Sequence, residues 1–571
     1  MQAPPGIHRT ELFWPKAQPM TDTLVPKIVS VFTEGYDGAR LRADAIAGLT
    51  VAIVALPLSM AIAIASGVTP DRGLYTAIVG GFLVSFLGGS RSQIGGPAGA
   101  FIVLVAATVN RHGVDGLLLA TMMAGVMLIA AGYLRLGKYI KFIPYPVTVG
   151  FTAGIAVIIF ASQLRDLLGI TLEGNEPGPF LDKITALAAA IDTINPPTVA
   201  TAALTIAVIF VLRKLRPHWP GMLIAIAVAS VAVALLHLPT ETIGTRFGGI
   251  PGGLPRPALP PLSFDRVAAV FPDAVSFALL GAIESLLSAV VADGMTGRRH
   301  RSSVELIGQG IANIGSALFG GICVTGTIAR TATNVRAGGT SPVSGMLHAA
   351  FLLAFMLVAA PLASYIPLAA LAGMLAVVAW NMVEKPAFMA LLRSSGGDAV
   401  VLLATFAIVV FRDLTEGIVV GFALGAVLFI DRMAKSIAIG KAKRPGSSAE
   451  ENGAEEHPVA ADDPDTVIYH ISGVFFFGSA ATVGSVLDRI ADQRRNFILD
   501  CSDVPFMDST AANVIEGTVR KAERTGVRFI VTGASHQVRR MLASHDVHEP
   551  RVATFASIEL ALDNIRGATK E

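Results

Sequence analysis

The sequence predicts an α-helical membrane protein with about fourteen membrane segments, followed by a small soluble α/β domain. Of its 571 residues, 53% are hydrophobic and 15% are charged, and the mean hydropathy is +0.63. These values are typical of an integral membrane protein. The apolar residues form two series of roughly seven runs each, separated by a Gly/Pro-rich loop from Phe247 to Leu262. Beyond Pro464, short strands and helices alternate, as in a soluble domain.

The first apolar run spans Ala45–Ser66 and contains Pro57. A proline inside a membrane helix removes one backbone hydrogen bond, which is tolerated where the helix lines a cavity or packs on neighbours. The other runs of the first series are expected at 74–88, 98–110, 117–134, 146–162, 197–212 and 221–237. Those of the second series are expected at 271–292, 304–319, 324–335, 343–360, 366–383, 398–411 and 414–430.

Basic residues gather in every second connection between these runs, as the positive-inside rule requires of cytoplasmic loops. The longest loop on the opposite side, Gln163–Pro196, is net acidic. We therefore expect both termini in the cytoplasm, with residues 1–40 as a cytoplasmic segment without a signal peptide. Translation from Met20 instead of Met1 stays open. The basic connections contain Arg91; Arg135, Lys138 and Lys141; Arg213, Lys214 and Arg216; Arg298, Arg299 and Arg301; Arg336; Lys385 and Arg393; and Arg432, Lys435, Lys441 and Lys443.

Two Gly-rich breaks stand at corresponding places in the two series. The first is Gln93–Phe101 and the second is Gly320–Arg330. Each precedes an apolar run too short to cross about 30 Å of hydrocarbon. Short, interrupted segments at matching positions in two halves indicate the central site of a transporter. The N-termini of two half-helices would bring partial positive charge and free N–H groups to the membrane midplane, which favours an anion. Alternatively, the two segments only fill the bundle.

Glu284 is the single carboxylate deep in the run 271–292. A charge at this depth costs roughly 2.5–3.5 kcal/mol on insertion scales, so an intramembrane acid is a functional candidate. Ser285 is adjacent, and Ser288 lies one turn further on the same helix face. We expect Glu284, together with Ser288, to carry a coupling proton. Alternatively, it is a structural carboxylate that bonds the helix ends.

Arg330 lies in the second half-helix, where a fixed cation adds to the field of the helix end. It either attracts the anion or only balances Glu284 or extends to the cytoplasmic face. Thr325, Thr327 and Thr331 can supply hydroxyl groups, although such groups often bond the preceding helical turn instead.

The sequence does not indicate a metal site, a catalytic site or a nucleotide-binding site. His112, His218 and His237 have no partners at metal-ligand spacing, so we assign no metal. No nucleophile–base arrangement and no phosphate-binding loop of the Walker type occurs. We therefore expect no enzyme activity and no cofactor, and the net charge of +2 gives no reason to expect nucleic acid. Cys323 and Cys501 do not indicate a disulfide framework.

The C-terminal region is expected to be a separate cytoplasmic domain at 465–571, joined to a membrane domain at 41–437 by a polar linker at 438–464. The two repeats of the membrane domain are placed at about 41–240 and 265–437. Within the soluble domain the pattern predicts paired strands at 467–477 and further strands at 497–501 and 527–532. It predicts helices at 480–490, 509–523 and 557–565.

Several motifs together resemble the SulP (sulfate permease) family of anion transporters. They are Pro70–Tyr75 continuing to Gly88–Arg91, Ile283–Ser288, Asp293–Gly297 and Thr325–Val335. The stretch Leu499–Thr510 is similar to a STAS domain, like those of anti-sigma-factor antagonists. The chain departs from the family pattern at Arg72, where Tyr is usual, and at Ala329, where Ser is usual.

The resemblance implies two inverted seven-segment repeats, an anion site between two half-helices, a cytoplasmic STAS domain, a homodimer and elevator-like movement. It implies a multi-pass protein of the bacterial inner membrane, whose STAS domain could bind a cytoplasmic partner and be regulated at Asp508, Ser509 or Thr510. By position, the anion site would comprise Pro57, Leu58, Ala98, Gly99, Ala100, Thr327, Ile328, Ala329 and Arg330.

Leu58 and Ile62 stand where many family members have Gln and Tyr, which disfavours sulfate. The stretch Leu56–Ala61, together with Ala329–Asn334, resembles a bacterial branch that includes a C4-dicarboxylate transporter. Proton-coupled dicarboxylate uptake is therefore our first expectation. Alternatives are a sulfate or bicarbonate transporter coupled to protons or Na⁺, a passive anion channel, or a sensor that signals through its STAS domain. A nucleobase permease is disfavoured because a neutral substrate gives Arg330 no task.

Overall fold

The computed structural model describes residues 24–142, 144–172, 174, 176–216, 219–435, 437–441, 465–480, 483–484 and 495–568. The choice between Met1 and Met20, His218, most of the expected linker and most of the helix expected at 480–490 lie outside these residues. The chain divides into two compact units, a helical unit Met1–Phe422 and a second unit Ala423–Glu571.

The first series of membrane segments is present as expected. Its third and fourth segments follow each other in α5 and are separated by a break at Gly113, where φ is 68°. The runs expected at 98–110 and 117–134 correspond to the two parts on either side of Gly113. The elements are α2 (Gly38–Ala65), the continuous run α3 (Pro70–Tyr75), η1 (Thr76–Gly80) and α4 (Gly81–Leu87), then η2 (Gly99–Phe101), α5 (Ile102–Tyr133), α6 (Tyr145–Leu168), α8 (Pro196–Leu215) and α9 (Gly221–Leu236).

The second series repeats this order from α11 onward. Its third segment, α13, has nine residues and is about 14 Å long, under half the thickness of the hydrocarbon. Eight helices of the described chain are long and apolar enough to cross a membrane, and α9 and α17 are shorter apolar helices. The elements are α11 (Phe264–Thr296), α12 (Ser302–Leu318), α13 (Ile328–Arg336), α14 (Val343–Ala363), α15 (Leu368–Met382), α17 (Gly396–Phe411) and α18 (Leu414–Lys435).

Short helices that the apolar pattern did not predict connect these segments. They are too short or too polar to produce a hydrophobic run, so hydropathy alone does not reveal them. They are α1 (Lys27–Thr33), η3 (Leu136–Phe142), α7 (Phe180–Ala189), η4 (Ile191–Thr193), α10 (Ile243–Phe247) and α16 (Lys385–Ser394).

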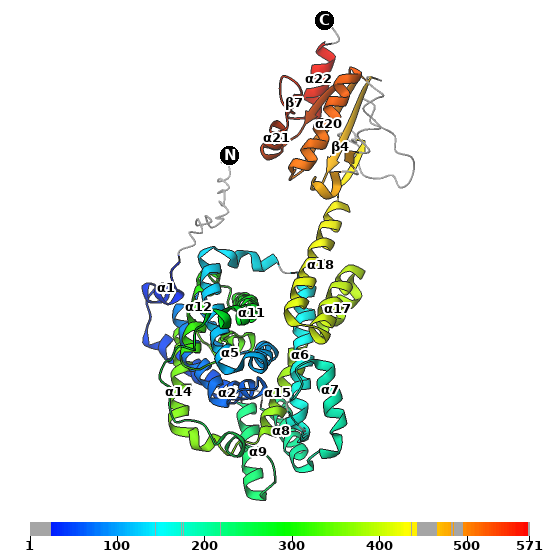
Figure 1. The fold of residues 1–571 in the computed structure, drawn as a ribbon. Helices are drawn as coiled ribbons and strands as arrows, with labels where there is room; N and C mark the ends of the chain where they lie inside the picture. The colour runs from blue at the N-terminus through cyan, green and yellow to red at the C-terminus, as the bar shows by residue number, and fades with distance from the viewer. Residues whose placement is uncertain are drawn as a thin grey trace, which may run out of the picture. The chain divides into compact units, whose positions relative to one another are not determined.

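The membrane helices pack as two bundles. In the first, α5 lies against α11 and α12, α2 lies against α14, and α13 lies against α2 and α11. In the second, α6 packs on α15 and α17, and α8 packs on α9 and α15. Figure 1 shows α2, α5, α11, α12 and α14 together on one side and α6, α7, α8 and α17 on the other. We call these the half-helix bundle (α2–α5 and α11–α14) and the partner bundle (α6, α8, α9, α15 and α17).

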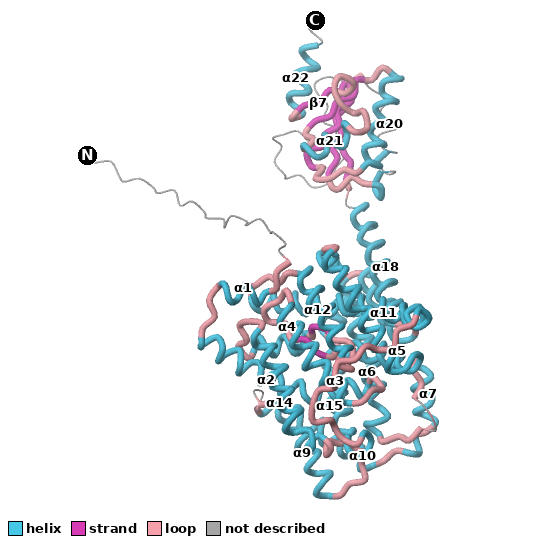
Figure 2. Tube along the Cα trace, turned by 60° about the vertical axis from the view of Figure 1, so that its left-hand side comes forward, coloured by secondary structure: helices cyan, strands magenta, loops and turns pink. Residues whose placement is uncertain are grey.

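The two half-helices start from a two-stranded antiparallel sheet inside the half-helix bundle. The sheet consists of β1 (Gly95–Gly96) and β2 (Thr325–Gly326). Figure 2 shows these strands as a short magenta segment enclosed by cyan helices. Strands with so few residues persist here because the surrounding helices bury both of them. The sheet joins the two series of segments at their corresponding breaks.

The second unit contains a five-stranded sheet in the order β3-β4-β5-β6-β7, in which β4 to β7 are parallel and β3 is antiparallel to β4. One apolar cluster includes residues of α20 and α21, and a second, smaller cluster includes residues of α22. The elements are β3 (Ala438–Lys441), β4 (Thr466–Ser472), β5 (Asn496–Asp503), α20 (Ser509–Thr525), β6 (Arg528–Thr532), α21 (His536–Ala543), β7 (Ala553–Phe555) and α22 (Ile558–Ala568).

Two expectations for this unit need correction. The residues 467–477 do not form paired strands, because β4 ends at Ser472 and its antiparallel partner is β3. That partner lies in the range 438–464, which the polar composition had assigned to a linker. Composition missed β3 because it has four residues and obtains its hydrogen bonds from a strand more than twenty residues away. The helix α21 and the strand β7 were also not predicted.

Candidate functional site

The two Gly-rich breaks meet at the centre of the half-helix bundle. Gly95 pairs with Gly326 and Gly96 pairs with Thr325 across the β1–β2 sheet. Beyond the sheet, the backbone N–H of Thr327 donates to the Ile94 carbonyl over 3.2 Å. The corresponding breaks in the two series are therefore joined directly by backbone hydrogen bonds.

Each break ends at the N-terminus of a half-helix, and the two N-caps have nearly the same backbone conformation. Ala98 precedes η2 and α5 with φ −112° and ψ 145°, and Thr327 precedes α13 with φ −110° and ψ 132°. Neither N-cap side chain accepts a hydrogen bond from its helix. The first-turn N–H groups therefore keep their capacity to donate to an anion.

Arg330 extends from the second half-helix to the first series of segments. Its Nη1 donates to the Pro97 carbonyl over 3.0 Å, and its Nη2 donates to the Ser59 hydroxyl over 3.1 Å. The side chain is 2% exposed, and its Nε is buried without a hydrogen-bond partner among the described residues. Two of the five N–H groups of the guanidinium are thus engaged by the protein, and the Nε–H is among those that remain for a ligand.

Gly96 is required for this arrangement. A Cβ atom at Gly96 would overlap Arg330 Nη1, because the two would lie far inside the contact distance of two heavy atoms. The absence of a side chain at Gly96 therefore allows the guanidinium group to reach the first break.

Glu284 lies on α11 and is partly exposed. Among the described residues its side chain makes no hydrogen bond and no ion pair within 4.0 Å, and in particular none with Arg330. The interpretation that Glu284 and Arg330 only neutralise each other therefore has no contact to support it. Ser288, one turn further along α11, is fully buried, and its hydroxyl donates to the Thr331 hydroxyl over 3.1 Å. Ser288 thus connects α11 to α13.

The remaining candidate residues line the same region with apolar groups. Pro57 is buried in α2 next to Leu58, which is 9% exposed, and Ala98 and Ala100 are also buried. Ile328 and Ala329 are exposed at the start of α13. A Cβ at Gly99 would lie 3.1 Å from Ile159 of α6 and 3.9 Å from the Met382 sulfur of α15. The first half-helix therefore starts where the half-helix bundle faces the partner bundle.

The three candidate threonines in and directly after the second break have different environments. Thr325 donates to the Gly281 carbonyl over 3.3 Å, and Thr331 accepts from the Ile94 N–H over 3.2 Å. The Thr327 hydroxyl is buried without a hydrogen-bond partner among the described residues. Thr327 is thus the threonine of this break that has a free hydroxyl group.

A fully buried carboxylate near this site, Glu305 of α12, was missed from the sequence. One of its oxygens accepts from the N–H groups of Gly89 and Ser90 over 2.8 and 3.0 Å. The other lies 3.4 Å from the Ser285 hydroxyl, which also accepts from Gln93 Nε2 over 2.9 Å. This network ties α11 and α12 to the segment that precedes the first break.

The sequence does contain a signal for this network. Glu305, Gln309 and Asn313 are spaced by four residues, and all three side chains are buried on one face of α12. A polar stripe at this spacing inside an apolar helix indicates bonding to a neighbouring element.

In the second unit, Asp508 is the N-cap of α20 and accepts from the Ala511 N–H over 2.9 Å and from the Phe477 N–H over 3.0 Å. Ser509 and Thr510 are exposed on the first turn of that helix. Cys323 and Cys501 are both free and buried. Burial raises the pKa of the Cys501 thiol to about 12, so this thiol stays protonated at neutral pH.

Comparison with known families decides the identity of this architecture. The profile of the sulfate permease family matches residues 41–405, and the STAS domain profile matches residues 457–561. The chain belongs to the sulfate permease family. It is therefore a multi-pass membrane protein of a family of anion transporters, with a C-terminal STAS domain, as the sequence motifs predicted.

Sequence relatives in the family carry different substrate names. The chain is 41% identical over 515 residues to "Putative sulfate transporter YvdB" of Bacillus subtilis, covering 89% of this chain and 94% of that protein. It is 32% identical over 519 residues to "Bicarbonate transporter BicA" of Picosynechococcus, covering 88% of this chain and 90% of that protein. The C4-dicarboxylate branch of the family is not among these names.

Two solved structures share the fold of this chain. SLC26A9 superposes with a TM-score of 0.84 at 17% identity, covering 96% of this chain and 93% of that one. The transmembrane domain of a cyanobacterial BicA superposes with a TM-score of 0.60 at 32% identity, covering 68% of this chain and 98% of that one. The predicted polytopic fold with an additional α/β domain is confirmed.

Proposed function

We propose that this member of the sulfate permease family is a secondary active transporter that couples anion uptake to protons, with C4-dicarboxylates as substrates. The observation that carries the proposal is the meeting of two half-helix N-termini beside Arg330, which has no acidic partner within 4.0 Å among the described residues. Two helix ends and one fixed cation in a low-dielectric site favour an anion. The bound anion would accept from the Nε–H of Arg330 and from the Thr327 hydroxyl.

The chemistry of the surrounding residues supports a dicarboxylate. Leu58, Ala98, Ala100 and Ala329 offer methyl and methylene groups, whereas the free side-chain donors are few. Sulfate exposes acceptor oxygens in all directions and would lose much hydration at such a site. A C4-dicarboxylate places its charge at two ends and presents a hydrocarbon chain between them, which fits apolar walls.

Glu284 is proposed as the proton carrier. It is partly exposed, lies one helical turn before Ser288, and has no partner among the described residues. A carboxyl group without a fixed partner can gain and lose a proton without breaking a structural bond. Ser288 would position α11 against α13, because its hydroxyl is bonded to Thr331.

The arrangement of the helices supports an elevator-like movement of the half-helix bundle past the partner bundle. Contacts within each bundle are extensive, whereas α2 makes few contacts with α9 and α15. The candidate site lies almost wholly in the half-helix bundle, so it can move with that bundle as a rigid body. The basic loops support cytoplasmic termini, and we propose a homodimer in the bacterial inner membrane with the STAS domain as a regulatory module.

A second candidate is bicarbonate or sulfate transport, coupled to Na⁺ or protons, which the names of the relatives favour. Reconstitution in proteoliposomes distinguishes the two. We expect labelled succinate or fumarate to accumulate under an inward proton gradient, and to do so without Na⁺. Accumulation of bicarbonate or sulfate with no dicarboxylate uptake would establish the second candidate. An anion flux that depends on neither the proton gradient nor the Na⁺ gradient would indicate a channel.

A further inference from the structure

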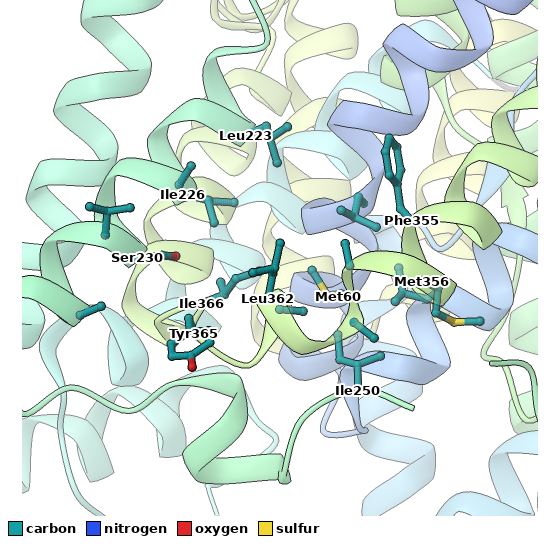
Figure 3. A pocket seen from close by; sticks show the side chains of 18 residues that line it. Met60, Leu223, Ile226, Ser230, Ile250, Phe355, Met356, Leu362, Tyr365 and Ile366 are labelled. Carbon is teal, nitrogen blue, oxygen red and sulfur yellow. The ribbon is translucent and has the colours of Figure 1, made fainter. Parts of the chain in front are cut away.

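An apolar pocket of about 480 Å³ lies between the two bundles, and none of the candidate anion-site residues lines it. Figure 3 shows Leu223, Ile226 and Ser230 on one side of it and Phe355 and Met356 on the other. The first three residues belong to α9 of the partner bundle, and the other two belong to α14 of the half-helix bundle. The pocket is thus a gap in the contact between the bundles, and its volume is in the range of small-molecule sites, roughly 300–1,000 Å³.

Water is a poor occupant of this pocket. Of its lining side chains, the Ser230 hydroxyl and the Tyr365 hydroxyl are the polar groups. The Ser230 hydroxyl is buried and has no hydrogen-bond partner among the described residues. A buried water needs about two to four polar partners, and helix backbones such as those of α9 and α14 have already paired their own groups.

An empty pocket is also unfavourable, because its lining atoms would lose dispersion contacts on one side. Its rim opens to the surroundings of the protein, since Val231, Leu362 and Tyr365 are 56%, 70% and 62% exposed. Val231 lies in the apolar helix α9 and Leu362 lies in the apolar helix α14. In a membrane, the medium at such a rim is lipid hydrocarbon.

We propose that one acyl chain of a neighbouring phospholipid occupies this pocket and acts as a spacer between the bundles. An acyl chain suits the apolar lining of the pocket, because a flexible hydrocarbon chain can fill an irregular apolar gap that neither water nor a side chain of the protein fills. The tyrosine at the rim provides a hydroxyl for the interfacial end of the lipid, as aromatic residues at membrane interfaces do.

The walls of the pocket belong to different bundles, so its shape must change when the bundles move past each other. An acyl chain that fits the pocket in one state therefore favours that state. The binding itself depends only on the pocket, whereas this effect on turnover rests on the elevator movement proposed above. The experiment below separates the two.

Quenching of tryptophan fluorescence by phospholipids brominated along the acyl chain tests the binding. Trp14, Trp219 and Trp380 are replaced by Phe, and Phe355→Trp places one reporter on the pocket wall. The control reporter is Val358→Trp, which is on the same helix and is 82% exposed in the native protein. We expect both reporters to be quenched, and Ala227→Phe, which fills the pocket from α9, to remove the quenching of the first reporter alone.

The proposed binding of an acyl chain is wrong if brominated lipid does not quench the Phe355→Trp reporter. It is also wrong if adding Ala227→Phe leaves the quenching of that reporter unchanged. Mass spectrometry of lipids that remain bound after delipidation provides a second measurement in the chain with its native tryptophans. We expect Ala227→Phe to lose retained phospholipid and Val358→Phe to keep it, and equal retention in both would also overturn the binding.

Uptake by the same two variants tests the effect on movement. We expect Ala227→Phe to change the rate of anion uptake and Val358→Phe to leave it at the native value, with anion affinity the same in both. If the acyl chain binds but Ala227→Phe transports at the native rate, the spacer role is wrong while the binding stands. If the unsubstituted chain transports no anion, the proposed function is refuted instead.

Discussion

The first and second breaks of this transporter have matching backbones and different side chains. Both run through a two-residue strand into a half-helix, and their N-caps, Ala98 and Thr327, have φ angles within a few degrees of each other. The first break and the residue before it, Ser92, supply mainly backbone groups, which are the Ser92 and Pro97 carbonyls and the Ile94 N–H. The second break and the half-helix after it supply the side chains that bond to these groups, from Arg330, Thr331 and Asn334.

This difference assigns separate tasks to the two breaks. The second break carries the cation and the free hydroxyl, and the first holds the cation in position with backbone atoms. Both contribute a helix N-terminus. Anion affinity should therefore depend on side chains of the second break and on the absence of side chains in the first, and three predictions follow from this contrast in order of expected effect.

The largest effect is expected at Gly96. Gly96→Ala places a methyl group on Arg330 Nη1, so it should displace the guanidinium group and abolish uptake. Size-exclusion profiles and proteoliposome uptake measure folding and transport. Gly294→Ala is the matched control, because a Cβ at Gly294 has no neighbour within 4 Å. Adding Arg330→Ala to Gly96→Ala should remove the overlap without restoring anion affinity. Native uptake by Gly96→Ala alone would refute this packing.

Removal of the cationic side chain of Arg330 should substantially lower the affinity for the anion. Coulomb attraction at about 4 Å and an effective dielectric of about 20 is about 4 kcal/mol, of which desolvation offsets a large part. For Arg330→Ala we expect a net loss of roughly 1–3 kcal/mol, which corresponds to about 5- to 150-fold in affinity. Isothermal titration with the transported anion measures this loss.

The matched control is Arg336→Ala, since Arg336 lies on the same helix and is exposed. Equal affinities for both variants would show that Arg330 is structural. If Arg330→Ala unfolds the protein and Arg330→Ala combined with Glu284→Ala refolds it, the two residues act as a neutralising pair, contrary to our account.

The smallest effect is expected at the two N-caps. Thr327→Val removes the free hydroxyl and should cost roughly 0.5–1.5 kcal/mol of anion binding, as for one hydrogen bond. Ala98→Gly at the corresponding position in the first break should leave the affinity nearly unchanged. Titration of both variants measures the contrast, and a larger loss at Ala98 than at Thr327 would reverse the assignment of tasks.

The sequence predicted the features that depend on local pattern. Hydropathy located the fourteen segments, and the Gly-rich breaks located the half-helices, because an interrupted apolar run is visible over a dozen residues. Glu284 and Arg330 stood out because charges inside apolar runs are rare. The soluble unit was recognised from its alternating strands and helices, apart from β3, α21 and β7.

The contacts that build the site were beyond prediction, because they join residues far apart in the chain. Arg330 bonds to Ser59, which lies 271 residues away, and Glu305 accepts from Gly89, which lies 216 residues away. No local pattern records which helices become neighbours. Sequence alone therefore left Arg330 with three possible tasks, and the structure reduced them by showing where its nitrogens bond.

The central claim is that Glu284 carries the coupling proton while the second break binds the anion. Glu284→Gln keeps the size and hydrogen bonding of the side chain but fixes it in a neutral form. We measure two fluxes in proteoliposomes, net anion uptake driven by a proton gradient and exchange of labelled for unlabelled anion without a gradient. Glu416→Gln, which alters an exposed carboxylate on α18, serves as the control. The account predicts that Glu284→Gln loses net proton-driven uptake and retains exchange, and full proton-driven uptake by this variant would contradict it.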